Sequence, residues 1–163
     1  MSIYYDKFIS EWVKRAERVD AVVDIGDKFM SLWVAFNGWL KKTHGEKKFD
    51  RELINCVIKH EGLNCIFEKE KLENSAYREL LRTISRYTVM DMRDSDDGNR
   101  YKDYNGSFSS LIEVIYQIRC NLFHGRKSAG EDDKDRELVN LAYCLLRPLL
   151  KKQLEEEGLL MQI

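Results

Sequence analysis

The sequence predicts an all-α protein, an up-and-down bundle of five or six helices. Only one proline occurs among the 163 residues, so few positions would interrupt a helix. Apolar residues recur three and four positions apart along several long stretches, which is the spacing of one face of an α-helix. Hydrophobic residues make up 44% of the chain and charged residues 34%, so one domain can bury a core and still expose a polar surface. We therefore expect residues 1–163 to form a single helical domain.

Three helices are expected in the first part of the chain, over residues 3–18, 24–42 and 50–62. The second is the clearest, because its large apolar residues recur with the helical period and Lys41 and Lys42 suit its C-terminal end. Asp50 is expected to cap the third helix and Gly62 to end it.

A further helix is expected over residues 75–87. The sequence changes character over residues 90–106, and the acidic run at residues 94–99, which has no period, is expected to be a loop. Ser107 or Ser109 is expected to cap the next helix, which runs to about Phe123 with a strong apolar stripe. The last helix is expected over residues 131–157, with a kink at Pro148, since proline removes one backbone hydrogen bond.

Charge and composition exclude several classes of protein. The net charge is −1, whereas a protein that binds DNA over its whole surface is distinctly basic, so any contact with nucleic acid must come from a local patch. The four cysteines form no CxxC pair and no cluster with histidine, so we expect no metal and no cofactor. Neither a signal peptide nor an apolar stretch long enough to span a membrane is apparent, so a reduced, cytoplasmic protein is expected.

The segment most suggestive of chemistry begins at Arg119 and ends at Gly125, where a strongly apolar helix runs into a histidine and a glycine. Cleavage of an RNA phosphodiester without a metal needs a base, an acid and a cation beside the phosphate. His124 can serve as base or acid because histidine titrates near neutral pH. Arg119 stays charged and can hold two phosphate oxygens. Arg126 and Lys127 follow at once and would bind the RNA backbone.

Three further residues are weaker candidates for the site: Asn121 and Cys120, which lie close to Arg119 in the sequence, and Asn37, which lies far from it. Asn121 could orient the imidazole or donate a hydrogen bond to phosphate. Cys120 lies four positions before His124, and an inert thiol is favoured over a nucleophile because no base is placed for it. Asn37, between large aromatic residues, is interpreted first as a buried amide with a satisfied hydrogen bond and alternatively as a site residue.

Helix geometry constrains how the two main candidates can act together. On a straight helix, five positions at about 100° each place Arg119 and His124 roughly 140° apart. They can converge on one phosphate only if the helix unwinds at His124 or if a second subunit contributes. Two-fold pairing of this helix would supply two histidines, one as acid and one as base.

Two segments of the chain resemble the HEPN superfamily, especially its Apea-like branch. Residues 115–125 (IYQIRCNLFHG) are similar to the family's R-x4-6-H signature at the end of a helix, and residues 32–39 (LWVAFNGW) resemble its aromatic second helix. The resemblance implies an up-and-down helical bundle, a homodimer with a composite cleft, and RNA cleavage that leaves a 2′,3′-cyclic phosphate. Arg119 and His124 match the two catalytic positions of the signature.

The sequence departs from that family at two positions. A polar residue usually follows the arginine, whereas this chain has Cys120, a weak hydrogen-bond partner. Toxins of the family that are silenced by a partner nucleotidyltransferase carry a tyrosine two residues after the histidine, where this chain has Arg126.

Three functions from different classes remain as hypotheses. The first is a metal-independent endoribonuclease with a toxin, defence or stress role, with RNA as substrate and a cognate antitoxin as a candidate partner. The second is a catalytically silent HEPN module that binds RNA, a nucleotide or a protein partner. The third is a helical interaction protein in which Arg119 and His124 coincide by chance.

Overall fold

The structure, a computed structural model, describes residues 2–18, 24–91, 101–123 and 133–160. These residues form an almost entirely helical bundle with one short hairpin, so the all-α prediction is confirmed. In chain order the elements are α1 (Ser2–Arg18), α2 (Ile25–His44), α3 (Asp50–Val57), α4 (Glu61–Glu73), α5 (Ser75–Ile84), β1 (Thr88–Met90), β2 (Tyr101–Asp103), α6 (Phe108–Phe123) and α7 (Asp133–Glu156).

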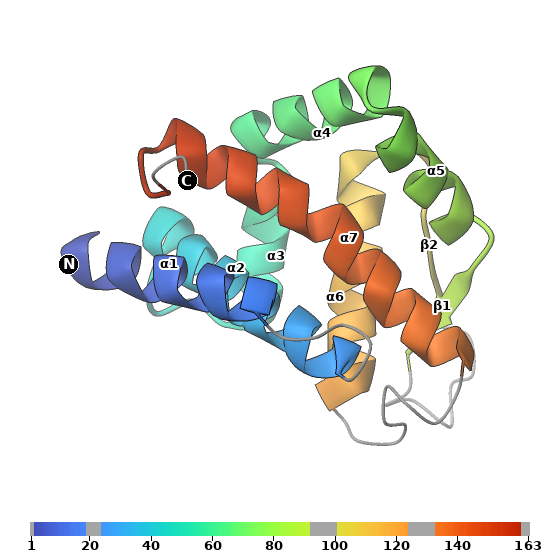
Figure 1. The fold of residues 1–163 in the computed structure, drawn as a ribbon, viewed down its shortest axis with the longest axis horizontal. Helices are drawn as coiled ribbons and strands as arrows, with labels where there is room; N and C mark the ends of the chain where they lie inside the picture. Colours follow the sequence, from blue (N-terminus) through green and yellow to red (C-terminus); the bar gives the residue numbers. More distant parts are fainter. Residues whose placement is uncertain (1, 19–23, 92–100, 124–132, 161–163) are drawn as a thin grey trace.

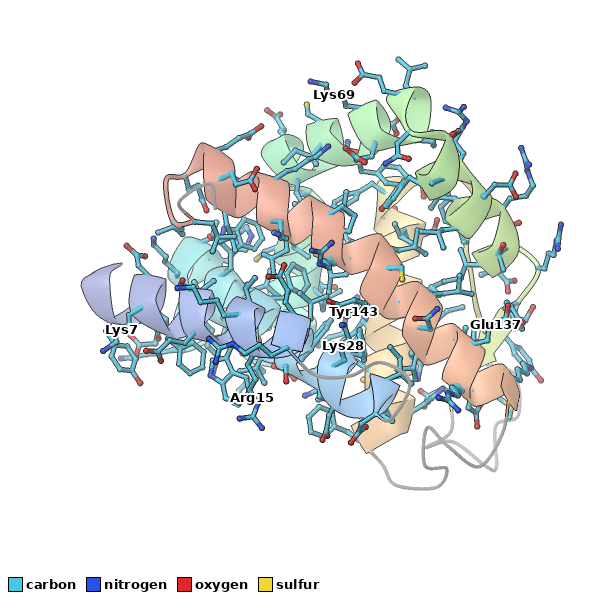
Figure 2. The ribbon with its side chains drawn as sticks, in the orientation of Figure 1. Lys7, Arg15, Lys28, Lys69, Glu137 and Tyr143 are labelled. Atoms are coloured by element: carbon cyan, nitrogen blue, oxygen red, sulfur yellow. The ribbon has the colours of Figure 1, made fainter. Side chains whose placement is uncertain are left out.

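Helix α7 organises the bundle. Figure 1 shows it as the long diagonal that crosses in front of α6, with α4 and α5 along one side and α1 and α2 on the other. It packs on α2, α4, α5 and α6, and its apolar residues are buried along most of its length. Pro148 lies inside α7, which continues past it to Glu156. In Figure 2 the Lys28 and Tyr143 side chains meet where α2 crosses α7, with the Lys28 ammonium 5.2 Å from the centre of the Tyr143 ring.

Helix α2 forms the centre of the core, as its sequence period predicts. Asp24 caps it by accepting a hydrogen bond of 3.0 Å from the backbone N–H of Asp27. Its large aromatic residues, Phe29, Trp33, Phe36 and Trp39, are all buried. Gly38 lets α1 approach closely, because a Cβ atom there would lie 3.1 Å from the Phe8 ring.

The prediction for residues 50–62 was wrong, because two helices replace the single expected one. Gly62 does not end a helix but is the second residue of α4. The break comes at His60, whose Nδ1 caps α4 by accepting a hydrogen bond of 3.0 Å from the N–H of Leu63. Histidine is an uncommon N-cap, so the usual signature of serine, threonine, aspartate or asparagine is missing at this boundary.

The run expected to be a loop, residues 94–99, lies outside the described residues, but the two short strands on either side of it were not expected. Strand β2 pairs antiparallel with β1, with Val89 opposite Lys102, and Val89 is buried. Three-residue strands are too short to show the period-two pattern that identifies strands in a sequence. Tyr87, just before β1, donates a hydrogen bond to Glu137 on α7, which Figure 2 labels near the beginning of that helix.

Helix α6 begins as expected. Ser107 caps it, since the Ser107 hydroxyl accepts a hydrogen bond of 3.2 Å from the backbone N–H of Ser110. Its apolar stripe is buried against the other helices. In the described part of the chain, no helix is both long enough and apolar enough to cross a membrane.

Candidate functional site

Arg119 lies on the last described turn of α6 and is held between aromatic rings. Its guanidinium carbon is 4.2 Å from the centre of the Phe123 ring and 5.7 Å from that of Trp33. Only 20% of the Arg119 side chain is exposed, and its Nε is buried without a hydrogen-bond acceptor among the described residues. These contacts hold a cation whose side chain still reaches solvent in part.

Asp50 connects Arg119 to Asn37. One carboxylate oxygen of Asp50 lies 3.0 Å from Arg119 Nη2, and the other accepts a hydrogen bond of 3.2 Å from Asn37 Nδ2. Asp50 was expected from the sequence to be the N-cap of α3, but Phe49 takes that position; Asp50 is the first residue of the helix, where the helix dipole stabilises a negative charge. The structure therefore brings together Arg119 and Asn37, two of the residues singled out in the sequence, through a third that was expected only to cap a helix.

Cys120 lies in the core, with 2% of its surface exposed. Its Sγ is 3.9 Å from Arg119 Nη1, at most a weak contact.

The neighbouring Tyr116 stacks on Trp33, with ring centres 6.0 Å apart. Burial, followed by the effect of Cys120, raises the pKa of Tyr116 to about 12, so its hydroxyl stays protonated at neutral pH and cannot act as a base.

Asn121 points away from Arg119, toward the hairpin. Its Nδ2 donates a hydrogen bond of 2.7 Å to the carbonyl of Met90, and its Oδ1 accepts one of 3.0 Å from Gln117. It also lines a cavity of about 120 Å³ between β1, α6 and α7. Asn121 therefore connects β1 to α6 by a hydrogen bond. Its side chain does not lie beside Arg119.

His124, Arg126 and Lys127, three of the predicted site residues, lie outside the residues that the structure describes. Their roles therefore stay predictions. Phe123, the last described residue before them, has 54% of its surface exposed and covers one side of the Arg119 guanidinium.

A second cation beside this site was not singled out in the sequence. Arg51, next to Asp50, donates two hydrogen bonds to Glu113 of α6, and its guanidinium carbon is 5.5 Å from the centre of the Tyr116 ring. The hydrogen bonds from Arg51 hold the pKa of Glu113 below its usual range. No sequence signal marks this pair, because its partners are 62 positions apart and meet only in the fold.

His44 and His60 are half-buried against Trp39. The three rings meet edge to face, and the centres of the two histidine rings are 5.7 Å apart. His44 Nε2 is buried and finds no hydrogen-bond partner in the described part of the chain. Burial, together with His60 and Lys48, lowers the pKa of His44.

This lowered pKa predicts a loss of stability in acid. The unfolded chain binds the His44 proton more tightly than the folded chain does, so the free energy of unfolding should fall as pH drops below about 6.5. Urea unfolding between about pH 7.5 and pH 5 measures this, and His44→Phe, which retains a ring beside Trp39, should flatten the dependence. Identical pH slopes for the two proteins would contradict the assignment to His44.

Among the described residues, no group of three histidine, cysteine or acidic side chains is placed to hold a metal ion. Comparison of the whole chain with protein-family models, with curated proteins and with solved structures gives no significant match in any of the three.

Proposed function

We propose that this chain is a metal-independent endoribonuclease of the HEPN type, acting in the cytoplasm in a toxin, defence or stress role. The supporting observation is the setting of Arg119. A guanidinium held by two rings and one carboxylate, on a side chain that is 20% exposed, suits a fixed cation that stabilises charge on a phosphate. His124 follows five positions later in the sequence, within the R-x4-6-H pattern.

The proposed reaction is an internal transesterification. His124, acting as base, takes the proton from the ribose 2′-hydroxyl, and the 2′-oxygen attacks the adjacent phosphorus. A second histidine, acting as acid, protonates the departing 5′-oxygen, leaving a 2′,3′-cyclic phosphate and a 5′-hydroxyl end. Arg119 stabilises the negative charge that grows on the phosphate oxygens during the attack.

The need for both an acid and a base supports a homodimer in which α6 lies near the two-fold axis, because one chain supplies one Arg–His pair. The exposed ring of Phe123 at the end of α6 would be covered by such pairing. We expect light scattering to give the mass of a dimer at micromolar concentration. A stable monomer under those conditions would count against the composite site.

Cleavage is expected to persist in EDTA. His124 and Arg119 together provide proton transfer and charge stabilisation, so a bound metal ion has no step left to perform. The test incubates the purified protein with a short random-sequence RNA pool with and without chelator, and identifies the new ends. Loss of cleavage on chelation that magnesium or manganese restores would exclude this mechanism.

The alternative is a catalytically silent HEPN module that binds RNA, a nucleotide or a protein partner, such as a cognate antitoxin. Two observations favour it: Asp50 already neutralises the Arg119 charge, and Cys120 is buried where the family usually has a polar residue. RNA that binds but stays intact would support this alternative.

A further inference from the structure

The carboxylate of Asp50 is shared between two helices. Its Oδ1 accepts a hydrogen bond from Asn37 of α2, and its Oδ2 lies 3.0 Å from Arg119 Nη2 of α6. An arginine and a carboxylate often pair through two parallel hydrogen bonds. Asn37 therefore engages one oxygen of Asp50, and the 3.0 Å contact with Arg119 is made by the other oxygen.

This single contact leaves part of the guanidinium available. Among the described residues, the only polar atom that Arg119 Nη1 contacts is the Cys120 sulfur, at 3.9 Å, which is a poor acceptor. The donors on that edge are therefore not used up by the ion pair, and a phosphate oxygen would be a far better acceptor for them.

The rings and the carboxylate restrict Arg119 in different ways. The Phe123 and Trp33 rings, whose centres lie 4.2 and 5.7 Å from the guanidinium carbon, hold the cation in place by cation–π attraction. This attraction does not fix the direction in which the N–H donors point. The ion pair with Asp50 does, because turning the guanidinium would carry Nη2 away from the carboxylate.

We propose that Asp50 is a positioning residue that aims the Nη1 donors of Arg119 at the scissile phosphate, at a cost in phosphate affinity. This inference rests on the proposed ribonuclease function. Asp50 remains 33% exposed, so its charge faces the same solvent from which an RNA phosphate would approach Arg119. A carboxylate there repels the phosphate while it orients the cation. Asn37 contributes by holding Asp50 to a single contact.

The test compares wild type with Asp50→Asn, which keeps the shape of the side chain and removes its charge. Binding is measured with a short random-sequence pool of 2′-O-methyl RNA, which cannot be cleaved by 2′-hydroxyl attack, and cleavage is measured with the unmodified pool at saturating enzyme. We expect about three- to tenfold tighter binding, from lost repulsion. We also expect about ten- to a hundredfold slower cleavage, from lost alignment.

Glu113→Gln is the matched control, because it removes a carboxylate that pairs with Arg51 on the same face and does not contact Arg119. It should tighten binding without slowing cleavage. Asp50→Glu keeps the charge but shifts it, and should slow cleavage with affinity nearly unchanged.

Opposite changes in affinity and rate distinguish positioning from a purely structural role, in which both would fall together with the melting temperature. If wild type cleaves RNA and Asp50→Asn cleaves at the same rate, only the role of Asp50 is overturned. If wild type neither binds nor cleaves RNA, the ribonuclease function fails and this inference fails with it.

Discussion

Replacing His124 with alanine is expected to slow single-turnover cleavage of RNA by about 10²–10⁴-fold, which is the usual contribution of a general acid or base. Affinity for uncleavable RNA should stay nearly the same, because a neutral imidazole contributes little charge to phosphate binding. The measurement pairs a cleavage time course at saturating enzyme with a binding titration on 2′-O-methyl RNA.

Arg126→Ala and Lys127→Ala provide the contrast. These substitutions should weaken binding and make its salt dependence shallower, since each would remove one proposed contact with the RNA backbone, and should leave the rate at saturating enzyme intact. Equal cleavage rates for wild type and His124→Ala would show that His124 is not catalytic, and the binding module would then replace the ribonuclease as the better proposal.

The strongest elements of the fold could be predicted from the sequence because they are long and regular. Helices α2 and α6 carry apolar residues at the helical period over 16 residues or more, and Asp24 and Ser107 mark their starts. The boundary between α3 and α4 could not be predicted, because it depends on a histidine cap. The hairpin was missed because each strand is only three residues long and the two strands are not adjacent in the sequence.

The candidate site could likewise be predicted only in part: its residues were found from the sequence, but the contacts between them were not. Arg119 and Asn37 stood out because of their own sequence surroundings, but their connection runs through Asp50 on a third helix. Such contacts depend on how α2, α3 and α6 pack, and local periodicity carries no information about that packing. The different surroundings of Cys120 and Asn121 follow from helical geometry, since each successive residue turns by about 100° and only one direction faces Asp50.

Removing the Arg119 side chain is expected to damage both turnover and binding. Arg119→Ala should slow cleavage by about 10²–10³-fold, as does loss of a group that stabilises an oxyanion, and should also weaken binding to uncleavable RNA. Arg119→Lys retains the charge but not the planar fork, so it should preserve most of the affinity and lose most of the rate. The same pair of assays measures both variants.

The structure offers a close control for these variants in Arg51. Like Arg119, Arg51 lies over an aromatic ring and pairs with a carboxylate, so Arg51→Ala removes a similar cation–π contact and ion pair from the same face. A general loss of stability would therefore slow cleavage in both alanine variants, whereas a specific role at the phosphate predicts that Arg51→Ala keeps the wild-type rate at saturating enzyme. If Arg119→Lys cleaves as fast as wild type, charge alone is sufficient, and the oriented guanidinium on which the proposed mechanism depends is not required.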